Sequence, residues 1–372
     1  MNASALVTAL RASRGFQHKT DIGEVLGILD RHIPRAGAGQ PLPVALGDDC
    51  AAIPDGSGYL LFAIEGFVED FINHNPWFAG YCGVMVNVSD IYAMGGRPIA
   101  IVDALWSCGM HPAAQLLDGM AVAAQRYAVP IVGGHTNNRA TRGQLAVAIL
   151  GRATHLLSSF AARPNDRLIM AVDLRGDYED PYPYWNASSN APAQRLRADL
   201  EILPQLAEGG LCNAAKDISM AGAIGTLLMM LESSRIGATL DVDAIPHPAT
   251  VDTDEALLRW LTAFPSYGFV LSVRPENVAP VMAAFQQRDL AVAVVGQVGQ
   301  VGQVVEVGQA GQVGQAGQIG QVGQVGQAGQ VSPHSRVMLQ HDGQEALLWD
   351  WDAQPFMAAR RTGLRERVAQ HA

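Results

Sequence analysis

Residues 87–98 read Asn87-Val88-Ser89-Asp90-Ile91-Tyr92-Ala93-Met94-Gly95-Gly96-Arg97-Pro98 and close a longer run of apolar residues with helical spacing. The spacing predicts a helix over residues 76–94 that ends at the glycine pair, because glycine favours the backbone that terminates helices. Asn87 and Asp90 are three positions apart and therefore share one face of this helix. A carboxylate and an amide on the inner side of an apolar helix need partners, which a hydrogen-bond network or a metal ion can supply. We favour the metal.

A pair of acidic residues follows the short strand predicted over residues 43–46. Asp48 and Asp49 are adjacent in a loop that begins with Gly47, and neighbouring carboxylates repel each other unless a cation lies between them. Magnesium with phosphate oxygens is the usual solution, although Gly-Asp-Asp is also common in solvated turns. With Asp90 as a third carboxylate, the sequence predicts a shared magnesium site.

A glycine pair follows a strand predicted over residues 129–132. Gly133 and Gly134 would let backbone N–H groups approach a phosphate, and His135 and Thr136 come directly after them. His135 is a candidate ligand or general acid–base, or a polar residue with a structural partner.

Lysine usage supplies another indication of phosphate chemistry. The chain has only two lysines, Lys19 and Lys216, and arginine supplies its other formal cations. A lysine ammonium is a compact, mobile point charge suited to bridging phosphates. The sequence contains neither a GxxxxGK(S/T) phosphate loop nor a GxGxxG fingerprint, so ATP, if bound, is bound by another design.

Composition limits the kinds of partner. The 372 residues carry a net charge of −10 and are 49% hydrophobic, which is enough for packed cores. The lack of a basic run argues against nucleic acid, because phosphate backbones are bound by basic patches. The four cysteines show no zinc-ligand spacing, and the N-terminus lacks the apolar stretch of a signal peptide. No apolar run is long enough to span a bilayer, so we expect a cytoplasmic protein without membrane contact.

Strands and helices alternate in two similar halves, which predicts an α/β (α+β) fold of two domains. We assign residues 1–155 to an N-terminal domain, and residues 156–295 and 332–372 to a C-terminal domain. Residues 296–331 repeat Gly-Gln-(Val/Ala/Ile) without proline. They therefore do not fit a collagen helix, and we interpret them as an expansion in a surface loop. Residues 177–190 lack periodicity and predict a long functional loop.

Taken together, these motifs resemble the superfamily of aminoimidazole ribonucleotide (AIR) synthase, selenophosphate synthetase and thiamine-monophosphate kinase. The residues that carry the resemblance are 47–52, 87–98, 133–136 and 216–219 and, for its AIR-synthase-like branch, 76–82 and 264–269. The resemblance covers nearly all of the chain apart from the repeat. It implies a two-domain AIR-synthase-like fold whose N-terminal domains pair in a homodimer, forming a β-barrel with ATP near the interface.

The resemblance also implies roles for individual residues. The ligands of Mg²⁺ on the triphosphate would be Asp48, Asp49 and Asp90, with Glu65 in place of the family's acidic residue after the second strand. The nucleotide would contact Gly133, Gly134, His135 and Thr136, and we add Asn87 from the helix face of Asp90. The catalytic candidates are Lys19, which resembles the lysine of selenophosphate synthetase, Asp217 from the second domain, and His135.

The expected function is Mg²⁺-dependent transfer of a phosphoryl group from ATP to a small-molecule acceptor, by a kinase or a ligase. We expect the acceptor between the domains, near Asp217, Ser219 and residues 182–186. Two departures weigh against particular relatives: residues 14–18 contain no reactive cysteine, and Met220-Ala221 replaces the Asp-Gly of thiamine-monophosphate kinase. The alternatives are a non-catalytic nucleotide-binding partner subunit and a kinase similar to thiamine-monophosphate kinase.

Overall fold

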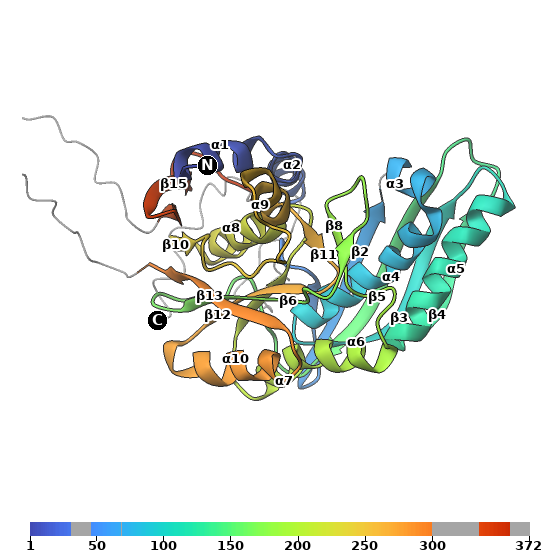
Figure 1. The fold of residues 1–372 in the computed structure, drawn as a ribbon. Coiled ribbons are helices and arrows are strands. Elements are labelled where there is room, and N and C mark those ends of the chain that lie inside the picture. Colours follow the sequence, from blue (N-terminus) through green and yellow to red (C-terminus); the bar gives the residue numbers. More distant parts are fainter. Residues whose placement is uncertain (31–45, 68, 300–334, 358–372) are drawn as a thin grey trace, which may run out of the picture.

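The computed structural model describes residues 1–30, 46–67, 69–299 and 335–357, which form a mixed α/β fold built on two main sheets (Figure 1). A five-stranded sheet has the order β1-β2-β5-β3-β4, and a seven-stranded sheet has the order β15-β14-β10-β13-β6-β12-β9. The predicted α/β class is therefore confirmed. In the single chain the five-stranded sheet is open, with β1 and β4 at its edges, so the described residues of one chain form no closed barrel.

Helices α4 and α5 pack on one face of the five-stranded sheet, which is built by the first half of the chain (Figure 1). Its elements are β1 (Ala51–Asp55), β2 (Gly58–Phe67), α4 (Pro76–Ala93), β3 (Arg97–Trp106), α5 (Met110–Tyr127), β4 (Ile131–Asn137) and β5 (Gln144–Ala153). The short helix α3 (Glu69–His74) precedes α4. The helix predicted over residues 76–94 is confirmed: Asn75 caps its start by accepting a hydrogen bond from the Phe78 N–H, and Gly95 follows its end with a φ of +76°.

Two glycines bring α4 and α5 into backbone contact. A Cβ at Gly80 would lie 2.0 Å from the Leu116 carbonyl oxygen, and one at Gly119 would lie 1.9 Å from that of Trp77. Any side chain at either position would force the helices apart. Residues 78–93 of α4 are all buried between α5, the sheet and the second half of the molecule. The polar groups of α4 are consequently held in a helix that is fixed on all sides.

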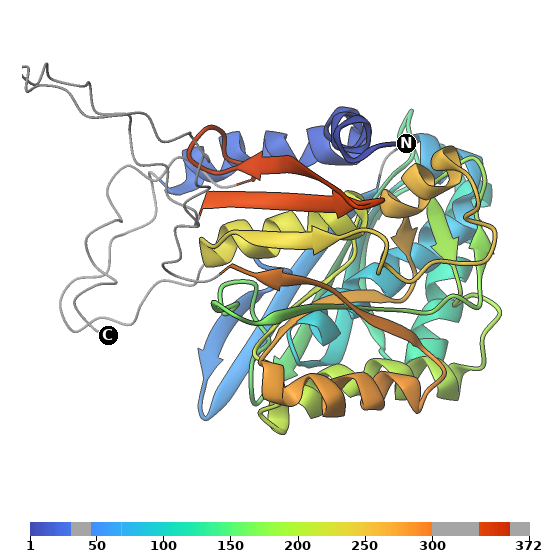
Figure 2. The same cartoon turned by 60° about the vertical axis from the view of Figure 1, so that its left-hand side comes forward.

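The seven-stranded sheet carries helices on both faces, α8 on one and α10 on the other (Figures 1 and 2). Its strands are β6 (Arg167–Val172), β9 (Ala214–Asp217), β10 (Ala238–Asp241), β12 (Gly268–Val273), β13 (Ala291–Val298), β14 (Arg336–His341) and β15 (Gln344–Asp350). The helices around it are α6 (Ala193–Leu200), α7 (Ile202–Glu208), α8 (Gly222–Ser234), α9 (Asp254–Leu261), the 3-10 turn η1 (Pro275–Asn277) and α10 (Val278–Gln286).

The N-terminal helices belong, by packing, with the seven-stranded sheet. Helix α1 (Ala3–Ala12) contacts β14 and β15, and α2 (Arg14–Asp30) contacts α8. The sequence grouped these residues with the first half of the chain. The packing partners of these helices, β14, β15 and α8, lie far along the chain, so no local pattern revealed this grouping.

Residues 177–190 are not the structureless loop that the sequence predicted. They contain β7 (Asp177–Tyr178) and β8 (Tyr184–Asn186), which pair with β11 (Phe264–Pro265) in a three-stranded sheet. These strands are two or three residues long and join segments about 80 residues apart, so no local pattern marks them.

Three other predictions need correction or fall outside the described residues. The segment Gly133–Thr136 lies inside strand β4, not in a turn after it. Strand β13 runs through residues 296–298, the first residues of the repeat, and pairs there with β10. The rest of the repeat, beyond residue 299, and almost all of the strand predicted over residues 43–46 lie outside the described residues. Within the described part, no helix is both long and apolar enough to cross a membrane.

Candidate functional site

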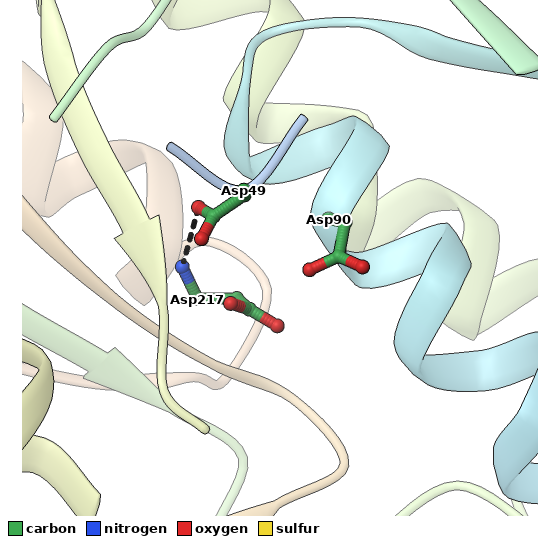
Figure 3. Close-up of side chains that lie close together, drawn as sticks. All are labelled: Asp49, Asp90 and Asp217. Atoms are coloured by element: carbon green, nitrogen blue, oxygen red, sulfur yellow. Dashed lines mark hydrogen bonds between the residues drawn. The ribbon is translucent and has the colours of Figure 1, made fainter. Parts of the chain in front are cut away.

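Three carboxylates from distant parts of the chain converge where the two halves of the molecule meet (Figure 3). Asp49 lies in the loop before β1, Asp90 on α4, and Asp217 at the end of β9. Each offers an oxygen, and these oxygens lie within 4.8 Å of one another. The structure therefore brings together Asp49 and Asp90, two of the predicted magnesium ligands, with Asp217, which was predicted as a catalytic residue.

Asp90 is the most isolated of the three. It is only 6% exposed, and its Oδ2 atom has no hydrogen-bond partner among the described residues. Burial, followed by the nearby charge of Asp217, raises the pKa of Asp90 well above its usual value. A buried carboxylate oxygen without a donor is costly unless a cation or a hydrogen bond satisfies it.

Lys216 supplies a positive charge inside this group. Its ammonium forms an ion pair with Asp49, and the two side chains are 6% and 4% exposed. Burial lowers the pKa of Lys216, but the charges of Asp49 and Asp48 outweigh burial, so the net shift is upward. Burial raises the pKa of Asp49 to about 7 and that of Asp217 to about 6, and Lys216 opposes both shifts. In the sequence, Lys216 is distinguished only as one of two lysines, which predicts no role for it in this site.

Asp48 points to a different partner. Its carboxylate accepts hydrogen bonds from the Ser158 hydroxyl at 2.7 Å and from the Ser159 hydroxyl at 2.6 Å. The Ser159 backbone N–H also donates to it, at 3.1 Å. Asp48 thus anchors the loop that carries Asp49 to the start of the second half, and the structure places it outside the group of three carboxylates.

A cavity of about 220 Å³ opens beside the carboxylates. Its acidic, lysine and histidine lining residues are His18, Lys19, Glu65, Asp90 and Asp217. Its other lining residues are Ile22, Gly66, Phe67, Phe71, Phe78, Cys82, Met85, Val86, Tyr184, Trp185, Ser219, Met220, Phe264 and Ser266. The predicted residues Lys19, Glu65 and Asp217 therefore share one cavity. Partial burial and then the charge of Lys216 lower the pKa of Lys19.

The predicted nucleotide segment lies elsewhere. Gly133–Thr136 is on the exposed edge strand β4, and it is not part of the cavity lining. His135 is exposed, and its ring centre lies 5.9 Å from that of Trp106. A Cβ at Gly134 would lie 2.4 Å from an Asp103 carboxylate oxygen, so this position requires glycine for packing. Asn87 is fully buried, donates to the Gly83 carbonyl at 2.8 Å and also lies outside the cavity lining.

Two family profiles match the chain in succession. The profile of the N-terminal domain of AIR synthase related proteins matches residues 47–153, and that of the C-terminal domain matches residues 176–308. The protein belongs to the AIR synthase related family. The resemblance that the sequence motifs indicated is thereby confirmed.

This AIR synthase related protein also matches individual relatives. It is 49% identical over 294 residues to an uncharacterised protein of Synechocystis sp., covering 79% of this chain and 89% of the relative. It is 26% identical over 274 residues to the selenide, water dikinase of Aeromonas salmonicida, covering 67% of this chain and 76% of that enzyme.

Among solved structures, the fold is similar to that of PurL from T. maritima complexed with ATP. The TM-score is 0.65 at 16% sequence identity, and the match covers 96% of this chain. The chain spans about half of that longer protein, 52% of its length. At this identity the similarity establishes the fold of the AIR synthase related protein and not its chemistry.

Proposed function

We propose that the protein transfers the γ-phosphoryl group of ATP to an oxygen atom of a small-molecule acceptor in a Mg²⁺-dependent reaction. The observation that carries this proposal is the convergence of Asp49, Asp90 and Asp217 beside a cavity that Asp90 and Asp217 line and that is large enough for a small molecule. Buried carboxylates with raised pKa values in a cleft are typical of functional sites. The chain belongs to the AIR synthase related family and is similar to an enzyme named selenide, water dikinase, which supports phosphoryl transfer.

The residues present fit a magnesium ion. The group offers only carboxylate oxygens, which are the ligands that Mg²⁺ prefers, and one of its members, Asp90, has an Oδ2 atom without a hydrogen-bond partner. Asp49, Asp90 and Asp217 would hold the ion. The negative charges of Glu65 and Asp48 act on Asp90 and Asp49 and would therefore also affect how tightly the ion binds. When bound, the ion would neutralise charge on the phosphates during transfer.

The chain's own residues would carry out the remaining tasks. Lys216 holds Asp49 in place, and Lys19, which lines the cavity, would position the phosphates. In the transfer step the acceptor oxygen forms a bond to the γ-phosphorus as the bond to the ADP oxygen breaks, and ADP leaves with the electron pair. Asp217, which lines the cavity, would accept the proton of the acceptor hydroxyl through the carboxylate oxygen that does not hold the ion.

Calorimetric titration of the non-hydrolysable analogue AMPPCP tests this function. We expect binding with Mg²⁺ present and at least about tenfold weaker binding with EDTA, because a cation must separate the carboxylates from the phosphates. A titration with Ca²⁺ in place of Mg²⁺ controls for general charge screening. Equal affinity with and without the metal, or no binding in either condition, would contradict the proposal, and no binding would favour a non-catalytic partner protein.

We also propose that two copies of the chain pair through the outer face of the five-stranded sheet. The face opposite α4 exposes Phe62 (49%) and Ile64 (65%) on β2 and Val102 (42%) on β3. Ile64 and Val102 both stand opposite Ala148 of the intervening strand β5, so the apolar side chains form a continuous surface. Exposed apolar surfaces of this kind mark interaction sites. Strand β4 borders this face, so Gly133–Thr136 would contact nucleotide across the interface of the pair.

Placing a charge on this surface should separate the pair. We expect Ile64→Asp to convert a dimer into a monomer in size-exclusion chromatography with light scattering, because a carboxylate buried in an apolar interface lacks a partner. Leu347→Asp is the matched control, since Leu347 is a similarly exposed apolar residue (42%) on β15 of the other sheet. A wild-type monomer at all concentrations, or a dimer that survives Ile64→Asp, would overturn the proposal.

A further inference from the structure

The cavity beside the carboxylates has a charged part and an apolar part. One face of α4 supplies Phe78, Cys82, Met85 and Val86, and the same face ends at Asp90. Residues at this spacing share one side of a helix, so a single wall passes from aromatic and aliphatic side chains to a carboxylate. A molecule lying along α4 would therefore place one end among apolar groups and the other near Asp90 and Asp217.

We propose that the acceptor is a planar aromatic or heteroaromatic small molecule with an uncharged ring and an oxygen-bearing substituent directed at Asp217. This inference rests on the proposed phosphoryl transfer, since it names the class of molecule that receives the phosphoryl group.

The apolar part is built by rings that come from four elements. Phe71 of α3 makes edge-to-face contacts with Phe78 of α4 at 5.9 Å and with Tyr184 of β8 at 5.0 Å between ring centres. Tyr184 in turn meets Phe264 of β11 edge-to-face at 6.2 Å. Phe71, Phe78, Tyr184 and Phe264 all line the cavity. A ring placed among them gains both apolar burial and favourable aromatic geometry.

The charged groups of the cavity interact with one another. Lys19 interacts electrostatically with Glu65 and Asp217, and Asp90 with Asp217 and Glu65. His18, the histidine of the lining, is exposed to solvent. A carboxylate or phosphate carried on the ring itself would thus enter the apolar part without a counter-charge, which is costly. This distribution selects an uncharged ring.

One hydroxyl in the lining favours a ring with a heteroatom. Ser266 accepts a hydrogen bond from the Ala187 N–H at 2.9 Å. In the described part of the structure the Ser266 hydroxyl proton has no acceptor, so it is available for a ring nitrogen or a carbonyl.

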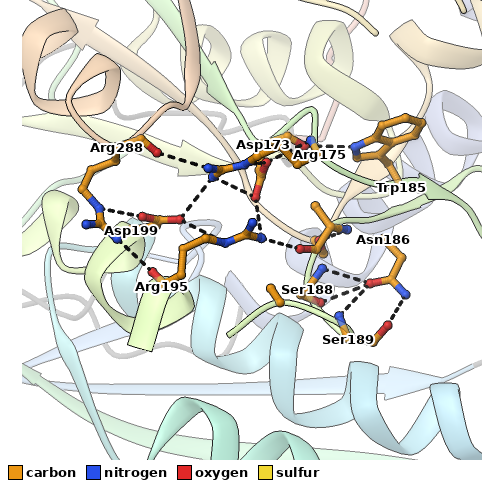
Figure 4. A network of polar contacts seen from close by, with 12 residues as sticks. Asp173, Arg175, Trp185, Asn186, Ser188, Ser189, Arg195, Asp199 and Arg288 are labelled. Atoms are coloured by element: carbon orange, nitrogen blue, oxygen red, sulfur yellow. Dashed lines mark hydrogen bonds and ion pairs between the residues drawn. The ribbon is translucent and has the colours of Figure 1, made fainter. Parts of the chain in front are cut away.

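A network of buried ion pairs fixes the segment that carries Tyr184 and Trp185 (Figure 4). The Trp185 indole N–H donates to the Asp173 carbonyl at 2.9 Å. Arg195 donates to the Asp173 carboxylate at 3.0 Å and to the Ala187 carbonyl at 2.9 Å. The pocket wall is therefore already formed before a ligand binds, which lowers the ordering cost of binding.

The inference is tested by measuring the binding of three matched probes with saturation-transfer NMR and titration. The probes are benzyl alcohol, 4-(hydroxymethyl)benzoate, which adds a charge to the ring, and cyclohexylmethanol, which removes planarity. We expect benzyl alcohol to bind at least about tenfold more tightly than the benzoate and severalfold more tightly than cyclohexylmethanol. Tyr184→Leu should abolish the preference for the aromatic alcohol. Tyr59→Leu is the control, because Tyr59 is also half-buried and lies on β2 six residues before Glu65.

Titrations with and without Mg²⁺ and AMPPCP separate the two hypotheses. If the nucleotide binds but the benzoate binds as well as benzyl alcohol, or Tyr184→Leu changes nothing, the acceptor class is wrong and the proposed function stands. If the probes discriminate as expected but the nucleotide does not bind, the pocket binds aromatic molecules and the phosphoryl-transfer function is wrong. Stimulation of ADP release by benzyl alcohol, and not by cyclohexylmethanol, would support both.

Discussion

Asp90→Asn should weaken Mg²⁺-dependent binding of AMPPCP by about 100-fold or more, while the metal-free protein becomes at least as stable as the wild type. The two effects have one cause. Asp90 is buried with a partnerless oxygen and a raised pKa, so its charge costs folding free energy in the absence of a cation. The amide removes that cost and also removes a ligand charge, and loss of even supporting groups around a metal lowers affinity by about 10–100-fold.

The measurements are calorimetric titration with AMPPCP and urea unfolding in EDTA. Asp166→Asn is the matched control, because Asp166 is equally buried (3%) but accepts from Ser272 at 2.8 Å and pairs with Arg274 at 3.2 Å. We expect this control to lose stability and to keep its metal-dependent binding. An Asp90→Asn protein that is less stable and still binds AMPPCP in a Mg²⁺-dependent way would show that Asp90 is a structural residue.

Lys216→Met should lower the free energy of unfolding by about 3–5 kcal/mol at pH 8, the usual cost of removing one partner of a buried ion pair. Methionine keeps most of the side-chain volume, so the loss reports the charge. The Asp49 carboxylate would remain buried without its counter-ion. The pKa of Asp49 is already raised by burial to about 7, and loss of Lys216 raises it further. Its protonation at pH 6 removes the unpaired charge, so the destabilisation should be smaller there.

Urea unfolding at pH 6 and pH 8 measures this effect. The other lysine of the chain is the natural control: Lys19 lines the cavity but is half-buried, so Lys19→Met should weaken nucleotide binding with a much smaller loss of stability. A Lys216→Met protein that is as stable as the wild type, or one whose destabilisation grows as the pH falls, would contradict the assigned role of Lys216.

The parts of the structure with strong local patterns were predictable from sequence. The long helix α4 has marked apolar periodicity, and the predicted range 76–94 agrees with its bounds to within a residue. Asp49 and Asp90 could be assigned to one site because an acidic pair and a carboxylate in an apolar helix both require a partner. Sequence patterns thus identified carboxylates whose charge needs a partner that the neighbouring residues do not supply.

The aromatic wall of the cavity could not be found in this way. Phe71, Phe78, Tyr184 and Phe264 come from segments up to about 190 residues apart, and each is an ordinary apolar residue in its local context. Only Tyr184 was suspected, through the composition of its loop. The placement of Asp48 on Ser158 and Ser159 was equally hidden, because it depends on how the second half of the chain packs against the first.

The backbone contact between α4 and α5 at Gly80 and Gly119 determines where this protein could be re-engineered. Because α4 and α5 pack so closely that an added Cβ would lie 2.0 Å or less from a carbonyl oxygen, we expect mutations along α4 to damage the scaffold before they reshape the cavity. The facing wall, formed by Tyr184 and Phe264 on short strands, has no such constraint from helix packing. A mutant library for altered ligand preference should therefore vary the facing wall and leave α4 as it is. We expect natural variation within the family to follow the same pattern, with more change in the facing wall than along α4.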